Sequence, residues 1–163
     1  MKFVLVDRIN ELVPGERVQT EKALSLAEEY LADHFPTFPV MPGVLMLEAM
    51  VQSAAWLMRA TTDFAHSVVV LAEARNITYK SFVSPGRVLA VRVEVVEQGP
   101  GEWRLKGRGS CGEQEMVRGQ LRMRQYNLRS GNPAWADVDA ELVRQARTTF
   151  RLLGGVVKTG GTV

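Results

Sequence analysis

The feature that most constrains the fold of this chain is the apolar run at residues 43–58, GVLMLEAMVQSAAWLM. The run is rich in helix-forming residues, has no glycine or proline after its first position, and is apolar on nearly every face. This pattern predicts a helix that is buried all round. Sixteen residues are too few to cross a bilayer comfortably, and the side chains of Glu48 and Gln52 would be costly there. We therefore expect a core helix and no membrane span.

After Asp63 the sequence changes to alternating and β-branched residues, which are typical of strands. The breaks between the strand-like segments have turn chemistry and a spacing that predicts an antiparallel meander. Before the apolar run, the turn at Pro14 and Gly15 separates two segments that predict two short strands or a hairpin, and LAEEYLADH predicts a short helix. The four later strands are expected in residues 67–79, 87–97, 102–111 and 115–126, with turns at 84–86, 98–101 and 112–114.

The four later strands place charged residues mostly on one face of the sheet and apolar residues on the other. The apolar face needs a cover, and only the helix at 43–58 is apolar enough to provide it. A sheet curled around one central helix is the economical arrangement, so we classify the fold as α+β. The charged face is strongly basic and comprises Arg92, Glu94, Arg104, Lys106, Arg108, Arg118, Arg122 and Arg124.

The end of the chain has a different pattern. Asn132 and Pro133 are a suitable N-cap and first helical residue, and the following segment predicts an amphipathic helix. The last ten residues contain four glycines and are expected to be loosely held. We therefore divide the chain into a domain at 1–126 and a C-terminal extension at 127–163 that contains a loop, an amphipathic helix and a flexible end. The apolar positions of that helix are Val138, Leu142, Ala146, Phe150 and Leu153.

Charge and cysteine content argue against several classes of protein. The formal net charge is +2, and the basic residues are neither densely clustered nor interleaved with aromatic residues, so nucleic-acid binding is not expected. Cys111 is the only cysteine, which rules out a disulfide or a cysteine-based metal site within one chain. Residues 1–13 lack the sustained apolar core of a signal peptide, so we expect a cytoplasmic location.

Glu48 and His34 are the strongest candidates for chemistry. A carboxyl group on an apolar helix loses hydration, which favours its protonated and therefore proton-donating form. Gln52 lies one turn later on the same face and could orient that carboxyl group by a hydrogen bond. An imidazole such as that of His34 is suited to moving protons near neutral pH. The two groups could thus act as general acid and general base.

The segment at residues 41–43, Met-Pro-Gly, opens the helix. The N–H groups of Gly43 and Val44 therefore have no acceptor within the helix and could stabilise a developing enolate oxygen. A structural interpretation stays open beside this one. A histidine before a loop is often a satisfied structural residue, and a single buried glutamate can be hydrogen-bonded to the backbone.

The segment HFPTFPVMPGVLMLEAMVQ, residues 34–52, closely resembles the signature of the 3-hydroxyacyl-[acyl carrier protein] dehydratases of the FabZ/FabA-like, hot dog-fold family. Weaker likeness extends to LVDRINELVPGERV near the start and to YKSFVSPGRVL at 79–89, so the resemblance covers about residues 3–126. The positions that match the signature are His34, Phe35, Pro36, Pro39, Met41, Pro42, Gly43, Val44, Leu45, Glu48, Ala49 and Gln52.

This resemblance implies a hot dog fold and the reversible dehydration of a (3R)-hydroxyacyl thioester to the trans-2-enoyl thioester, without a metal or redox cofactor. His34 would take the C2 proton, Glu48 would protonate the departing 3-hydroxyl group, and the Gly43 N–H would hold the thioester carbonyl. In the family, the histidine and the acid of one site come from different protomers, which implies a homodimer, with a trimer of dimers as the alternative assembly. The expected acyl tunnel is lined by Phe35, Met46, Met50 and Trp56.

The implied partner is an acyl carrier protein that bears the substrate. Such carriers are acidic, and a basic row on this chain offers electrostatic complementarity, although a solvated sheet face is the commoner meaning of such a row. The row consists of Lys80, Arg87, Arg104, Lys106, Arg108, Arg122 and Arg124.

Three features depart from the family pattern. Thr37 and Phe38 stand in the loop after His34, the segment 79–83 lacks the family's proline and has Ser81 in place of a second arginine, and the extension from residue 127 onward is long. Two other functions therefore stay open. One is a related enzyme, either an isomerase of the enoyl product or a hydratase or thioesterase that uses a coenzyme A thioester. The other is a catalytically weak hot dog subunit that binds acyl chains or supports a partner enzyme.

Overall fold

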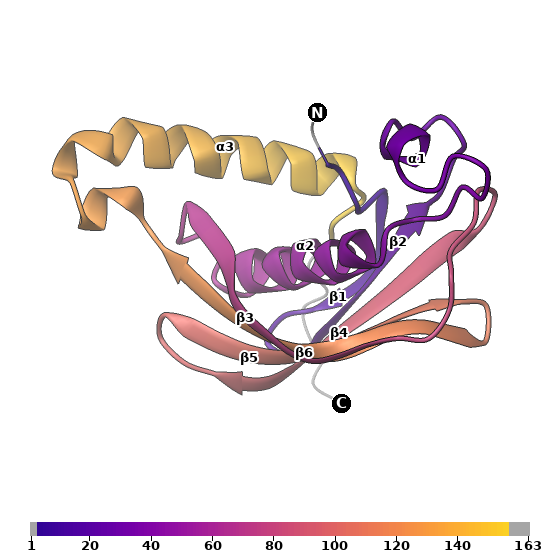
Figure 1. Cartoon of the computed structure of the whole chain (residues 1–163). Coiled ribbons are helices and arrows are strands. Elements are labelled where there is room, and N and C mark those ends of the chain that lie inside the picture. Colours follow the sequence, from indigo (N-terminus) through magenta and orange to yellow (C-terminus); the bar gives the residue numbers. More distant parts are fainter. Residues whose placement is uncertain (1–2, 157–163) are drawn as a thin grey trace.

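The computed structural model describes residues 3–156, so the predicted flexible end at 157–163 lies outside the described residues. A six-stranded antiparallel sheet curls around one long helix, and a second long helix follows the sheet (Figure 1). This is the hot dog arrangement that the resemblance implied. The strands are β1 (Arg8–Val13), β2 (Arg17–Ala23), β3 (Val68–Tyr79), β4 (Val88–Gln98), β5 (Glu102–Cys111) and β6 (Gln114–Tyr126). The helices are α1 (Tyr30–Asp33), α2 (Gly43–Thr61) and α3 (Ala136–Leu152), with short 3-10 helices η1 (Leu128–Ser130) and η2 (Pro133–Trp135).

The strand order is β1-β2-β4-β5-β6-β3, which corrects part of the predicted meander. β1 and β2 form the expected hairpin, and β4, β5 and β6 are consecutive neighbours. β3, however, pairs with β6 and lies at the edge of the sheet, because β4 uses its other edge to pair with β2 from Val88 to Glu94. The turn at 84–86 is accordingly no hairpin: the Gly86 N–H donates to the Leu24 carbonyl at 2.8 Å.

α2 packs its apolar face against the concave side of the sheet (Figure 1). Met50 is fully buried, and a Cβ atom on Gly107 of β5 would lie 2.9 Å from its sulfur, so this close approach needs a glycine. The hydroxyl groups of Ser53 and Thr20 are 2.7 Å apart and join α2 to β2 inside the core. The helix runs three residues beyond the predicted end and stops before Asp63 and Phe64, which both have positive φ angles.

The expectation that this helix is buried all round is wrong for the single chain. One stripe of α2 is only partly covered, and Val44 near its amino end is 63% exposed. A sequence pattern records that side chains are apolar, and it does not record whether the cover comes from the same chain or from another. The stripe consists of Val44, Leu45, Glu48, Gln52 and Trp56.

The C-terminal extension folds back over the side of α2 that faces away from the sheet (Figure 1). Phe150 of α3 is buried, with its ring centroid 6.0 Å from that of Trp56 and 5.4 Å from that of Phe64. After α3, the Ile9 N–H of β1 donates to the Leu153 carbonyl at 2.8 Å. α3 therefore belongs to the same hydrophobic core as α2.

The predicted cap of this extension is present, although it caps a different turn. The Asn132 side chain accepts a hydrogen bond from the Ala134 N–H at 3.1 Å, at the start of η2 and ahead of α3. The predicted apolar face is partly wrong, because Val138 is 47% exposed. Asp139 is buried in its place and accepts hydrogen bonds from the Ser67 hydroxyl and, at 2.9 Å each, from the amides of Leu128 and Arg129. A carboxylate, rather than an aliphatic side chain, thus anchors the beginning of α3.

No helix among residues 3–156 is both long and apolar enough to cross a membrane. The cytoplasmic location stays a prediction. Within the same residues, no three His, Cys, Asp or Glu side chains converge so that they could hold a metal ion.

Candidate active site

The loop that carries His34 leads directly into the amino end of α2. His34 ends α1 in an extended conformation, and Phe35 has a φ of 51°, which is uncommon for a residue other than glycine. The rings of His34 and Phe35 lie 4.5 Å apart between centroids, and the Phe38 N–H donates to the Phe35 carbonyl at 2.8 Å. Farther along, the Met41 N–H donates to the Val83 carbonyl at 2.8 Å and ties the loop to the β3–β4 connection. His34 is therefore held, partly buried, on a constrained loop.

The amino end of α2 has free backbone donors. No side chain caps it, and the first helical hydrogen bonds run from Leu45 and Met46 to the Pro42 carbonyl, at 2.9 and 3.3 Å. Among residues 3–156, no acceptor is recorded for the N–H groups of Gly43 and Val44. These two donors lie at the positive end of the helix dipole and are available to an oxygen atom from outside the helix.

Tyr79, at the end of β3, lies against this helix end, and the sequence did not mark it as a site residue. A Cβ atom on Gly43 would lie 3.2 Å from two carbon atoms of the Tyr79 ring, so the glycine permits the close approach. Partial burial raises the pKa of the Tyr79 hydroxyl above its ordinary value, and the side chain is still 47% exposed. A neutral aromatic ring therefore borders the Gly43 backbone.

Glu48 lies in the second turn of α2 and accepts a hydrogen bond at Oε1 from Nε2 of Gln52, at 3.0 Å. This is the contact that the i, i+4 spacing suggested. Gln52 is itself bound by the N-terminal segment: the Leu5 N–H donates to its Oε1 at 3.0 Å, and its Nε2 also donates to the Phe3 carbonyl at 3.2 Å. Glu48 is only partly buried in the single chain, so the fully apolar surroundings expected for it are not complete here.

No hydrogen bond joins His34 to Glu48 within the part of the chain that the structure describes. The only other histidine, His66, lies beyond the carboxyl end of α2, and its buried Nδ1 has no hydrogen-bond partner among the described residues. Within the described residues, one chain therefore places an imidazole and a carboxyl group on neighbouring segments, without a hydrogen bond between them.

The four side chains expected to line an acyl tunnel face different neighbours. Met46 and Met50 are buried in the core, and Met50 lies over Gly107 of β5. Trp56 packs on Phe150 of α3, and Phe35 is 58% exposed. The tunnel lining therefore stays a prediction.

An apolar rim surrounds the amino end of α2. Phe38 and Phe82 meet edge to face with ring centroids 5.9 Å apart, and both are about 60% exposed. An exposed apolar group of this kind on a folded chain marks an interaction surface or a binding groove. The rim consists of Phe35, Phe38, Val44, Tyr79 and Phe82.

The outer face of the sheet is basic, as the alternating pattern predicted, but carboxylates neutralise much of it. Lys106 and Arg92 bind Glu94 at 2.9 and 2.7 Å and lower the pKa of that carboxyl group to about 2. Further pairs are Arg104 with Glu97, Arg122 with Glu73 and Glu102, and Lys80 with Glu115. Arg108 and Arg124 have no ion pair among residues 3–156. The face therefore keeps only a modest excess of positive charge.

Comparison with known proteins decides the family. A FabA-like domain is matched over residues 1–120. The chain belongs to the FabA-like family.

Curated members of the FabA-like family resemble the chain over most of its length. The 3-hydroxyacyl-[acyl-carrier-protein] dehydratase FabZ of Levilactobacillus brevis is 35% identical over 111 residues, which cover 68% of this chain and 75% of the relative. The FabZ of Variovorax paradoxus is 37% identical over 130 residues, covering 77% of this chain and 87% of the relative. Among solved structures, a chain of the dehydratase heterocomplex ApeI:P from Xenorhabdus doucetiae superposes with a TM-score of 0.63 at 22% identity, covering 77% of this chain and 84% of the other. That last likeness supports the fold alone.

Proposed function

We propose that this member of the FabA-like family dehydrates a (3R)-hydroxyacyl thioester on an acyl carrier protein to the trans-2-enoyl thioester, in fatty acid or related acyl-chain synthesis. The observation that carries the proposal is the amino end of α2, where two free N–H groups stand one turn ahead of a carboxyl group that Gln52 holds in place. Relatives more than 30% identical bear the name of this activity.

In this mechanism the Gly43 N–H donates to the thioester carbonyl oxygen, which makes the C2 proton more acidic. The His34 imidazole takes that proton, and negative charge develops on the carbonyl oxygen. The C3–O bond then breaks, with its electron pair leaving on the hydroxyl oxygen, which takes a proton from Glu48 and departs as water. The C2=C3 double bond forms, and a proton passes from His34 back to Glu48 through solvent to restore the site. The reverse sequence is hydration.

A dimer completes the site in this proposal. The apolar rim is exposed in the single chain, and β3 is an edge strand with only β6 beside it, so both are available to a second copy. His34 of one protomer would then meet Glu48 of its partner. A trimer of such dimers is the alternative assembly.

The carrier protein would approach the same end of α2. Arg108 lacks an ion pair among the described residues and offers its charge to an acidic partner, whereas Lys80, which follows Tyr79 directly, is bound by Glu115 at 2.7 Å. Because carboxylates bind most of the other basic residues, we expect the carrier to be held weakly and with strong dependence on salt.

The decisive experiment measures turnover of (3R)-hydroxyacyl-carrier substrates of several chain lengths by mass spectrometry. The purified protein should form the trans-2-enoyl carrier and should also hydrate that product. His34→Ala and Glu48→Gln should each lower kcat by about 10² to 10⁴-fold. His66→Ala is the matched control and should leave kcat unchanged, since His66 lies beyond the other end of α2. A cis-3 product would indicate an isomerase, free thiol a thioesterase, and tight acyl binding without turnover a non-catalytic subunit.

The shared site has its own test. A heterodimer with His34→Ala in one protomer and Glu48→Gln in the other keeps one complete site only if each site draws on both protomers. We expect about half of the wild-type activity per dimer. An inactive heterodimer would place both groups of each site in one protomer.

A further inference from the structure

The orientation of the Gln52 side-chain amide is fixed by the main chain of the N-terminal segment. The Leu5 N–H can only donate, so the Gln52 atom 3.0 Å away must be the oxygen. The Phe3 carbonyl can only accept, so the Gln52 atom 3.2 Å from it must be the nitrogen. These two contacts determine the orientation together, without reference to Glu48. A reversed amide would face a donor with a donor and an acceptor with an acceptor.

This orientation determines which oxygen of Glu48 can carry a transferable proton. The second hydrogen of the Gln52 amide points at Oε1 of Glu48, at 3.0 Å. A carbonyl-type oxygen accepts such a bond better than a protonated one, so the carboxyl proton is placed on Oε2. After the proton has left, the same N–H stabilises the resulting carboxylate. Both hydrogens of the Gln52 amide are then donated, one to Phe3 and one to Glu48, and its oxygen accepts from Leu5.

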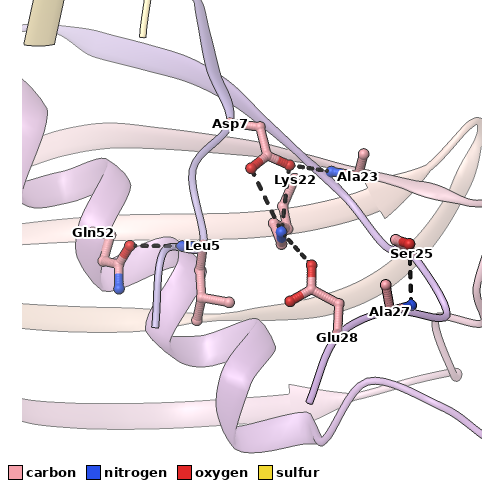
Figure 2. A network of polar contacts seen from close by, with 8 residues as sticks. All are labelled: Leu5, Asp7, Lys22, Ala23, Ser25, Ala27, Glu28 and Gln52. Carbon is pink, nitrogen blue, oxygen red and sulfur yellow. Dashed lines mark hydrogen bonds and ion pairs between the residues drawn. The ribbon is translucent and has the colours of Figure 1, made fainter. Parts of the chain in front are cut away.

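The N-terminal segment is in turn held by an ion-pair network centred on the buried Lys22, which Figure 2 shows from close by. Asp7 accepts a hydrogen bond from the Ala23 N–H at 2.8 Å and lies 3.5 Å from Nζ of Lys22. Nζ of Lys22 also donates to Glu28 at 2.6 Å, and the Lys22 side chain is only 7% exposed. One cation thus joins the segment, strand β2 and the chain before α1.

Packing and a backbone hydrogen bond also hold the N-terminal segment, which connects Lys22 to Gln52. Leu5 is 1% exposed, and the Phe3 ring lies 6.2 Å from that of Tyr30 between centroids. The Asp7 N–H donates to the Glu21 carbonyl at 2.8 Å, one residue before Lys22 in β2. These contacts tie the segment to β2 and to Tyr30, while the Gln52 amide ties it to α2.

We propose that residues 3–7, secured by Lys22, are a positioning element that sets the Gln52 amide so that Glu48 presents Oε2 as its proton donor. Lys22 acts only through this segment and is a positioning residue. The inference rests on the proposed dehydration, in which Glu48 is the general acid. It adds a requirement for an N-terminal segment and a buried lysine, both remote from the reacting atoms.

The test is a double-mutant cycle on kcat with a carrier-bound substrate. Gln52→Met removes the amide at similar length, and Lys22→Met removes the cation. We expect each to lower kcat by about 10 to 100-fold with KM within about twofold, because a catalytic group misplaced by about 1 Å loses rate of this order. In the Gln52→Met background, Lys22→Met should cause almost no further loss, since there is no amide left to orient. Lys22→Arg should restore most of the activity.

Losses that multiply in the double variant would overturn the proposal, and so would a Lys22→Met enzyme with wild-type kcat. Asp139→Asn is the control for a merely destabilising change, because Asp139 lies at α3 and touches neither segment; its effect on kcat should be small in both backgrounds. If Lys22→Met does not fold, Asp7→Asn tests the same link while keeping an acceptor for the Ala23 N–H. Wild-type turnover is measured first, so that an inactive wild type refutes the proposed function and not the positioning element.

A second readout does not depend on catalysis. The side-chain amide resonances of Gln52 should shift in Lys22→Met and stay unchanged in Asp139→Asn. Unchanged resonances in Lys22→Met would show that Lys22 does not control the Gln52 amide.

Discussion

The two ends of α2 differ in how far the chain itself covers them. At its amino end, the backbone donors of Gly43 and Val44 are free and the surrounding rim of aromatic and aliphatic side chains is exposed. At its carboxyl end, α3 covers Trp56 with the buried ring of Phe150, and Asp139 fixes the start of α3. One end is closed by the chain's own extension, while the other stays open, and the proposed substrate and second copy would bind there. The extension therefore contributes to stability where the site does not need access.

The largest expected effect comes from placing a charge in the open rim. Phe82 is 60% exposed and packs edge to face on Phe38. In a dimer the Phe82→Glu variant would bury an unpaired charge, which costs at least about 3 kcal/mol and raises the dissociation constant by about 100-fold or more. Sedimentation should show the dimer dissociating and activity falling with it, while the circular dichroism of the monomer stays native.

Leu152→Glu is the matched control for this prediction. Leu152 is 80% exposed at the end of α3, and the same substitution there should leave both association and activity unchanged. Dissociation caused by Leu152→Glu instead would show that the closed end also carries an interface.

The next effect concerns the stability that α3 provides. Phe150→Ala removes a ring that is 6% exposed and contacts both Trp56 and Phe64. Deletion of a buried phenylalanine side chain lowers the free energy of unfolding by about 3 to 5 kcal/mol, whereas Leu152→Ala, at an exposed position, should change it by less than about 0.5 kcal/mol. Denaturant titration measures both. Because the open end is untouched, kcat per folded molecule should persist; its loss would mean that α3 also shapes the site.

Much of the fold can be predicted because each helix and strand depends on the pattern of apolar and polar residues within its own segment. The apolar run predicted α2 to within three residues of its observed end, and the alternating segments predicted all four later strands. The pairing of β3 with β6 could not be predicted in this way, since it depends on which edge of β4 is already occupied by β2.

In the candidate site too, contacts between residues close in sequence could be predicted, and contacts between distant residues could not. The spacing of Glu48 and Gln52 on one helix suggested their hydrogen bond, which depends on helix geometry alone. The contact between Leu5 and Gln52 joins positions 47 residues apart and has no local signature. Asp139 was missed because a carboxylate in the first turn of a helix is normally taken to be solvated, and only the fold places Ser67 beside it.

The smallest expected effect is a dependence of stability on pH that arises at Asp139. Burial alone would raise the pKa of Asp139, but hydrogen bonds from the Ser67 hydroxyl and the amides of Arg129 and Leu128 hold it below its ordinary value. Since the folded pKa is depressed, the stabilisation is complete above the unfolded pKa of about 4 and is lost as pH falls through the folded pKa. Asp139→Asn should therefore destabilise the protein at neutral pH, by less than Phe150→Ala does, and the difference from wild type should shrink below about pH 4. Thermal melts between neutral and acidic pH measure this difference.

Asp137→Asn, at an exposed position two residues earlier, should show no such pH dependence. A difference for Asp139→Asn that is equal at pH 7 and at strongly acid pH would show that the shape of the side chain, and not its charge, anchors α3 at the closed end.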